Sequence, residues 1–131
     1  MQILLDASVV MAVLIDEPEK NSIIKLTKGS VLIAPNVIDF EIGNALSKLY
    51  KRKIFTQQEV YEAYTTYKQI PLNIKTVNVN NSINIFCKHS IYAYDAYYLE
   101  LATRLNLPLL TFDTQMKTIA KELNVKTLEI I

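Results

Sequence analysis

The sequence is short of cysteine, histidine and glycine, and each shortage excludes a class of chemistry. Cys87 is the only cysteine, so an internal disulfide and a multi-cysteine zinc site are both excluded. His89 is the only histidine, whereas a paired-histidine nuclease mechanism needs two. Gly29 and Gly43 cannot form a glycine-rich phosphate loop, which excludes nucleotide hydrolysis of the P-loop kind. We expect His89 to be an exposed polar residue and Cys87 to be packed or an idle thiol.

Long apolar segments and a large net charge are also missing. The longest largely apolar stretch, residues 7–15, is well short of the ~20 residues that a membrane-spanning helix needs. The opening MQILLD has no basic leader of the kind that begins a signal peptide. A cytoplasmic protein without membrane contact is therefore expected. The net charge of +1 gives no global attraction to nucleic acid, so any such binding has to be local.

The 131 residues, half of them hydrophobic, predict a single domain over residues 1–131. Short apolar runs alternate with segments of helical period. The runs predicted to be buried strands are Ile3–Leu5, Val31–Ala34, Ile74–Val79, Leu109–Phe112 and Val125–Leu128. Strands separated by helices pair in parallel through right-handed crossovers. The predicted fold class is α/β: a three-layer α/β/α sandwich around a central, mostly parallel five-stranded sheet.

The starts of three helices are legible between these strands. Asp16, Pro18 and Glu19 precede one helix, and Pro35 opens the next directly after the second strand. Thr56 is followed three residues later by a glutamate, which is the pattern of a capping box.

Four acids are predicted to meet at the carboxyl edge of the sheet, where α/β folds bind their ligands. Asp6 follows the first strand directly, and Asp113 follows the fourth. The helix after Asp95 runs about 16 Å away from that edge, and the next strand returns about as far, so Asp95 ends near Asp113. Glu41, in the second turn of the helix predicted to begin at Pro35, leans toward the same edge because helical side chains tilt toward the N-terminus.

A helical wheel places Asp95 on the shoulder of an apolar stripe, opposite a solvated face made of Glu100, Thr103 and Arg104. The residues of the stripe are Tyr94, Tyr98, Leu101, Ala102 and Leu105. In the earlier helix the wheel places Glu41 on one shoulder of the buried stripe and Asp39 on the other, and it does not choose between them.

Each acid also has a purely structural interpretation. Asp6 and Asp113 both precede helices that they are able to cap. Asp95 is placed to complement a helix dipole, and Glu41 to be a surface charge. Convergence argues against these interpretations, since four neighbouring carboxylates repel one another and raise their pKa values unless a cation neutralises them. Carboxylates without histidine or cysteine suit a hard cation such as Mg²⁺ or Mn²⁺.

Four motifs, taken in order, carry a family resemblance: LLDASVV, FEIGNAL, YAYDAYYLELA and LLTFDTQM. With them the chain resembles PIN domains over nearly its full length, and among these the small VapC-like toxins of bacterial and archaeal toxin–antitoxin pairs. The resemblance implies that the acids of these motifs form a magnesium- or manganese-dependent ribonuclease site. The matching catalytic and metal-binding residues are Asp6, Glu41, Asp95 and Asp113, and Asp39 does not match. Ser8, Asn44 and Thr111 match supporting polar positions.

One residue departs from the pattern, since Ala7 stands where the family often has Thr or Ser. This departure concerns the fine positioning of the metal, and Ser8 keeps the hydroxyl that follows. The resemblance also implies a cognate antitoxin and a homodimer. Tyr61, Tyr64 and Tyr67, at three-residue spacing, are candidates to line a groove for a partner helix.

Binding of RNA needs positive charge near the acids, and KLYKRK is the best local source. Its Lys48, Lys51, Arg52 and Lys53 are equally explained as solvated cations that complement a helix dipole. Among the tyrosines at positions 92, 94, 97 and 98, an exposed one is able to stack on a base, whereas most are expected in the core or an interface.

The resulting hypothesis is a metal-dependent endoribonuclease that cuts single-stranded or looped RNA and acts as a toxin restrained by a partner. Two alternatives share the fold: a PIN-like binding module without turnover, and a housekeeping RNA-processing nuclease. A phosphoreceiver-like signalling domain is ranked last, because it predicts a lysine after the last strand and the chain ends in LEII.

Overall fold

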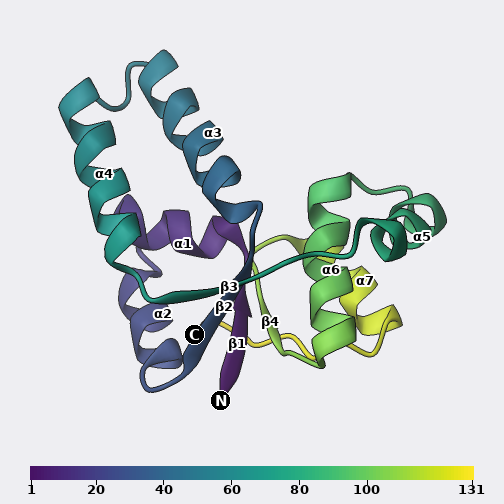
Figure 1. Ribbon diagram of the computed structural model, residues 1–131. Helices are drawn as coiled ribbons and strands as arrows, with labels where there is room; N and C mark the ends of the chain where they lie inside the picture. Colours follow the sequence, from purple (N-terminus) through teal and green to yellow (C-terminus); the bar gives the residue numbers. More distant parts are fainter.

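The computed structural model describes all 131 residues. Its strands and helices follow one another in the order β1–α1–α2–β2–α3–α4–β3–α5–α6–β4–α7 (Figure 1). The strands are β1 Gln2–Leu5, β2 Val31–Pro35, β3 Leu72–Lys75 and β4 Leu109–Leu110. The helices are α1 Ala7–Leu14, α2 Lys20–Thr27, α3 Ile38–Lys51, α4 Gln57–Gln69, α5 Val79–His89, α6 Ala93–Leu105 and α7 Thr114–Glu122. None of these helices combines the length and the apolar character that crossing a bilayer requires.

The sheet is parallel throughout, with strand order β3-β2-β1-β4. Successive side chains of a strand point to opposite faces. In β1, Ile3 and Leu5 therefore join the core under α1 and α3, whereas Leu4 joins the core under α6 and α7. Helices cover both faces, and Figure 1 shows the three layers with the sheet seen nearly edge-on. The predicted α/β class and three-layer architecture are confirmed.

The predicted fifth strand, Val125–Leu128, is wrong, because the sheet has four strands. This segment forms a single parallel bridge between Leu109 and Thr127. Strand β4 is only two residues long, and after Leu110 the chain turns away toward the N-cap of α7 at Asp113. A partner this short gives a fifth strand almost no backbone groups with which to pair.

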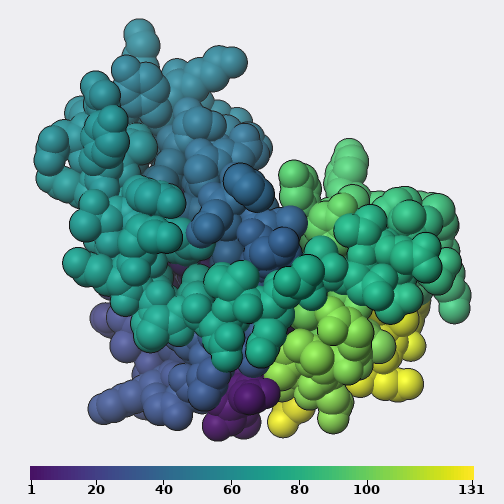
Figure 2. Space-filling model, viewed as in Figure 1, coloured from purple at the N-terminus to yellow at the C-terminus, as the bar shows by residue number.

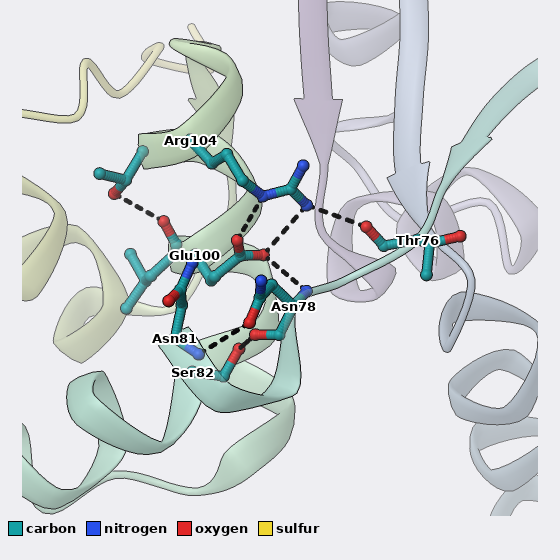
Figure 3. Close-up of polar contacts among 8 residues, drawn as sticks. Thr76, Asn78, Asn81, Ser82, Glu100 and Arg104 are labelled. Atoms are coloured by element: carbon teal, nitrogen blue, oxygen red, sulfur yellow. Dashed lines mark hydrogen bonds and ion pairs between the residues drawn. The ribbon is translucent and has the colours of Figure 1, made fainter.

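Strand β3 also differs from its prediction, since it spans Leu72–Lys75 and not 74–79. It ends early because side chains of α6 bind the backbone that follows. Arg104 Nη2 donates to the carbonyl of Thr76 at 2.9 Å, and the amide of Asn78 donates to Glu100 Oε2 at 3.1 Å. Figure 3 shows these bonds holding the chain between β3 and α5 against α6. Backbone groups held in this way are not available to β2.

Glu100 contradicts the helical wheel, which placed it on a solvated face. The residue is 2% exposed and pairs with Arg104 Nε at 2.5 Å, while the predicted apolar residues Tyr94 and Leu105 are exposed. Helix α5 packs against α6 and begins beside Glu100. Burial of a carboxylate is tolerated here because the guanidinium and a backbone amide both satisfy it (Figure 3).

Replacing Glu100 by Ala is expected to lower the free energy of unfolding by about 2–3 kcal/mol, because the Asn78 amide loses its acceptor and a cavity remains. Glu100→Gln keeps the shape and an acceptor oxygen and should cost less. Urea denaturation measures both variants. Glu62→Ala, at an exposed glutamate of α4, is the control and should stay within about 0.5 kcal/mol of wild type. Equal stability of Glu100→Ala and Glu62→Ala would contradict the assignment.

Helix starts follow the sequence signals closely but not in every case. The Thr56 capping box is confirmed: the Glu59 amide donates to Thr56 Oγ1 at 3.2 Å, and the Thr56 amide donates to Glu59 Oε1 at 3.0 Å. Helix α2 begins with Glu19 as its N-cap. Helix α3 begins at Ile38 and not at Pro35, because Pro35 still belongs to β2 and the Asn36 amide still bonds the carbonyl of Lys75. Glu41 therefore lies in the first turn of α3 and not in the second.

Candidate functional site

Asp6 is held at the carboxyl end of β1 by two hydroxyl groups. It occupies the N-cap position of α1, but its side chain makes no cap bond, so the capping interpretation is wrong for this residue. Instead, Oδ2 accepts hydrogen bonds from Thr111 Oγ1 at 2.7 Å and from Ser8 Oγ at 2.8 Å. The residue is only 7% exposed. Burial raises the pKa of Asp6 above its ordinary value, the two hydroxyl groups act in the opposite direction, and the charge of Asp113 adds to the rise.

Asp113 caps a helix and also lies in the carboxylate cluster. Its Oδ1 accepts the Met116 amide of α7 at 2.9 Å, so the capping interpretation is correct here. That bond uses one carboxylate oxygen and leaves Oδ2 available. The Asp113 amide donates to Thr111 Oγ1 at 3.0 Å. Thr111 therefore joins two of the acids, since it donates to the carboxylate of Asp6 and accepts from the backbone of Asp113.

Asp95 lies in the first turn of α6, half-buried, and its carboxylate receives no hydrogen bond from the protein. Burial raises its pKa to about 6, and the charges of Asp113 and Asp6 contribute to the rise. The structure therefore places Asp95 close enough to both residues to sense their charges. Figure 1 shows α6 beginning beside the edge at which β1 ends.

Glu41 comes from the opposite side, on α3. Its Oε1 accepts a hydrogen bond from the Tyr98 hydroxyl at 2.8 Å. Burial raises the pKa of Glu41 to about 7, the Tyr98 hydrogen bond acts against the rise, and the charges of Asp6 and Asp95 add to it. Tyr98 is a site residue that the sequence analysis missed, because the wheel placed it in an apolar stripe. The available signal was its hydroxyl, which needs a partner when a tyrosine is buried.

The four carboxylates share one electrostatic site at the carboxyl edge of the sheet, since each of the shifted acids senses at least one of the others. In this structure no three of these side chains lie close enough together to hold a metal ion between them. The donor chemistry nevertheless fits a hard cation, because every polar side chain of the cluster presents oxygen and none presents nitrogen or sulfur. Burial is the main cause of the raised pKa values of Asp6, Glu41 and Asp95, and repulsion between the acids adds to it. A cation would offset that repulsion.

Asp39 lies apart from this cluster. It is exposed, and its Oδ1 accepts the hydroxyl of Tyr67 from α4 at 2.5 Å. The two shoulders of α3 therefore differ: Glu41 faces α6 and the other acids, whereas Asp39 faces α4. The wheel left this choice open, and the neighbouring helices settle which acid is near the others.

The remaining candidates have mixed outcomes. Asn44 is exposed and lines a pocket together with Ser8 and Glu41. His89 was expected to be exposed, but its side chain is 10% exposed and its Nδ1 lies 3.3 Å from the carboxylate of Glu122. This burial follows from its position at the end of α5, which packs on α6. Cys87 is an exposed, free thiol and is not packed.

Comparison with known proteins shows which family and fold this chain resembles. The model of the PIN domain family matches residues 3–122. A ribonuclease named VapC1 from Mycobacterium tuberculosis is 28% identical over 96 residues, covering 70% of this chain and 69% of that protein.

Two solved structures are similar in fold. VapBC2 from Rickettsia felis, bound to a DNA fragment from its promoter, superposes with a TM-score of 0.71 at 14% identity and 98% coverage of both chains. VapC20 of Mycobacterium tuberculosis, described as a sarcin–ricin loop cleaving toxin, superposes with a TM-score of 0.64 at 12% identity, over 89% of this chain and 94% of that one.

Proposed function

Because this chain belongs to the PIN domain family, we propose that it is a metal-dependent endoribonuclease that acts as the toxin of a toxin–antitoxin pair. The observation that carries the proposal is the convergence of Asp6, Glu41, Asp95 and Asp113 on one edge of the sheet, where burial and neighbouring negative charge raise the pKa values of Asp6, Glu41 and Asp95. Relatives named as VapC ribonucleases support the reaction class. We place the enzyme in the cytoplasm and treat residues 1–131 as a single PIN domain.

The proposed mechanism assigns a role to each side chain. The four acids would hold Mg²⁺ or Mn²⁺, which when bound activates water and stabilises the charge that develops at phosphorus. Thr111 and Ser8 fix the orientation of Asp6 through their hydroxyl hydrogens. Tyr98 holds Oε1 of Glu41 in place, and the other oxygen of this carboxylate would take the proton of an attacking water. The oxygen of the water would bond to phosphorus as one P–O bond of the RNA breaks, and the departing sugar oxygen would take a proton from solvent.

The direct test is incubation of the purified protein with total cellular RNA and Mg²⁺ or Mn²⁺, with and without a chelator. Cleavage that requires the metal supports the proposal. Failure to cut RNA with either metal would favour the binding module without turnover. Cutting confined to maturation sites of a precursor RNA would favour a housekeeping nuclease over a toxin.

Thr111→Val is expected to reduce cleavage about 10- to 100-fold, the usual effect of removing a residue that orients a metal ligand. Valine keeps the shape of threonine but removes the donor to Asp6 and the acceptor for the Asp113 amide. When the cleavage rate is measured at increasing concentrations of Mg²⁺ or Mn²⁺, the metal should activate Thr111→Val less than it activates the wild type. Thr103→Val is the matched control, because the Thr103 hydroxyl bonds only the carbonyl of Leu99 within α6. Equal activity of the two variants would remove Thr111 from the mechanism.

This chain has a surface on which the proposed antitoxin could bind. Tyr61 and Tyr64, as predicted, line a groove of about 510 Å³ between α3 and α4, together with Leu46 and Val60. The third tyrosine, Tyr67, is buried and bonds Asp39. The apolar lining suits one face of an amphipathic helix, and similar folds are described as toxin–antitoxin complexes. Co-purification of a small protein with this chain tests the partner. The homodimer that the family resemblance implies stays a prediction.

A further inference from the structure

A pocket of about 350 Å³ lies directly beside the carboxylates, and it contains chemistry that the metal-binding role does not use. Glu41, Asn44 and Lys48 line it from α3, and Tyr94 lines it from α6. Further lining comes from Ser8 and neighbouring residues of α1 and from Phe40. We call it the Lys48 pocket. Helices α3 and α6 belong to the two lobes that a notch separates in Figure 2.

Two aromatic rings of the Lys48 pocket face solvent. Phe40 is 72% exposed and Tyr94 is 51% exposed, although both are large and apolar in their rings. Tyr94 packs edge-on against Tyr97, with ring centroids 5.8 Å apart and planes at 85°, which positions its ring before any ligand binds. Exposed aromatic rings beside a phosphodiester-cleaving centre are the surfaces on which single-strand binders stack bases.

Lys48 supplies the positive charge that the sequence analysis sought near the acids. It is exposed and forms no ion pair, although it shares the pocket with the carboxylate of Glu41. Seven residues separate the two along α3, which is about 10 Å at 1.5 Å per residue. An unpaired ammonium group at this place is suited to a phosphate of a strand that also reaches the acids.

A neighbouring pocket shows the reverse charge. It has a volume of about 310 Å³ and shares Ser8 and Met11 with the Lys48 pocket, but its charged residues are Glu17 and Glu19. A polyanion is repelled there, whereas Lys48 offers it one positive charge beside Glu41. The charge difference between the two pockets therefore favours the Lys48 pocket for the substrate strand.

We propose that the Lys48 pocket is a nucleotide-binding subsite for one unpaired nucleotide of the RNA next to the bond that is cut. The base stacks on Phe40 and Tyr94, and the ammonium group of Lys48 binds the neighbouring phosphate. The substrate class is single-stranded, because a base inside a duplex has both faces covered by its neighbours. This inference rests on the proposed ribonuclease function and adds the residues that position its substrate.

The test of Lys48 is the salt dependence of RNA binding. A fluorescein-labelled single-stranded RNA of about 12 nucleotides is titrated by anisotropy at about 50 to 200 mM KCl in Mg²⁺, with Asp95→Asn as a non-cutting background. Adding Lys48→Gln should make the slope of log K against log salt shallower by about 0.7, the loss of one phosphate contact to a single strand. Lys68→Gln, an exposed lysine of α4 outside the pocket, is the matched control and should leave the slope unchanged.

The aromatic side chains have a separate readout. In the same background Phe40→Ala and Tyr94→Ala should each weaken binding of the single strand about tenfold, while binding of a blunt duplex of the same sequence stays the same. Ile83→Ala, at an exposed large apolar residue of α5 outside both the pocket and the groove, is the control and should change neither.

Two results of the RNA-binding assays overturn the subsite: an unchanged salt slope for Lys48→Gln, or equal losses on single strand and duplex for the aromatic variants. The subsite is also overturned if the Lys48, Phe40 and Tyr94 variants bind a co-expressed small protein more weakly but bind RNA as before, because the pocket then binds a protein partner. The wild-type protein is assayed for RNA cleavage in parallel. Absent cleavage rejects the proposed function, whereas cleavage with unchanged binding parameters rejects the subsite alone.

Discussion

Asp95→Asn is expected to lower the rate of RNA cleavage at least about 10³-fold, because several kcal/mol of charge stabilisation at phosphorus depend on the acids that hold the cation. The same substitution should raise the melting temperature of the metal-free protein, since it removes one of the charges that repel at the site. Cleavage of RNA with Mg²⁺ or Mn²⁺ and thermal unfolding in chelator measure the two effects. A variant that is inactive because it is misfolded would melt at a lower temperature, not a higher one.

The matched comparison for this prediction lies on α3. Glu41→Gln should lose activity as Asp95→Asn does, because Glu41 senses the charges of Asp6 and Asp95. Asp39→Asn, two residues earlier on the same helix, should keep activity, since Asp39 bonds Tyr67 on the side of α4. Retained cleavage in Glu41→Gln, or equal losses in both variants, would show that the geometry of the cluster does not determine the activity.

The stability of the metal-free protein should fall as pH rises from about 5 to 8, by about 3 kcal/mol after allowance for solvent screening. Burial and like charge raise the pKa of Asp95 from 3.8 to about 6 and that of Glu41 from 4.5 to about 7. Between the ordinary and the raised pKa values the folded protein binds more protons than the unfolded chain. The contribution of these two groups to stability is therefore fully present below about pH 4 and is lost as pH rises through 6 and 7.

Thermal unfolding in chelator at pH 5 and pH 8 measures this loss, which corresponds to a fall of roughly 10 °C in melting temperature. Excess Mg²⁺ or Mn²⁺ should shrink the fall, because the cation binds the ionised carboxylates of the folded state. The double variant Glu41→Gln with Asp95→Asn should shrink it without metal. A melting temperature that stays constant or rises from pH 5 to pH 8 in chelator would mean that the acids are not crowded in solution.

Several features that depend on near neighbours were predicted correctly. The capping box needs only Thr56 and Glu59, which are three residues apart, and both of its bonds are present. The parallel sheet follows from strands separated by helices. Asp6 lies at the carboxyl edge because it directly follows β1. Asp113 lies three residues beyond β4, which ends at Leu110 and not at Phe112 as predicted.

Contacts between distant residues were not predictable from these patterns. Thr111 binds Asp6 across 105 positions, and Tyr98 binds Glu41 across 57. A helical wheel gives the direction of a side chain around its axis but not what lies in that direction. This is why Glu100 was placed in solvent, although α5 packs over it, and why Glu41 and Asp39 were indistinguishable until α6 and α4 were in position.

The sequence by itself determined the α/β class, the capping box at Thr56 and the set of acids available to a cation. Only the tertiary structure decided the number of strands, the burial of Glu100 and the partners that orient Asp6 and Glu41. The physical reason is that periodicity and capping act within a few residues, whereas the environment of a carboxylate is set by helices that pack against it from far along the chain.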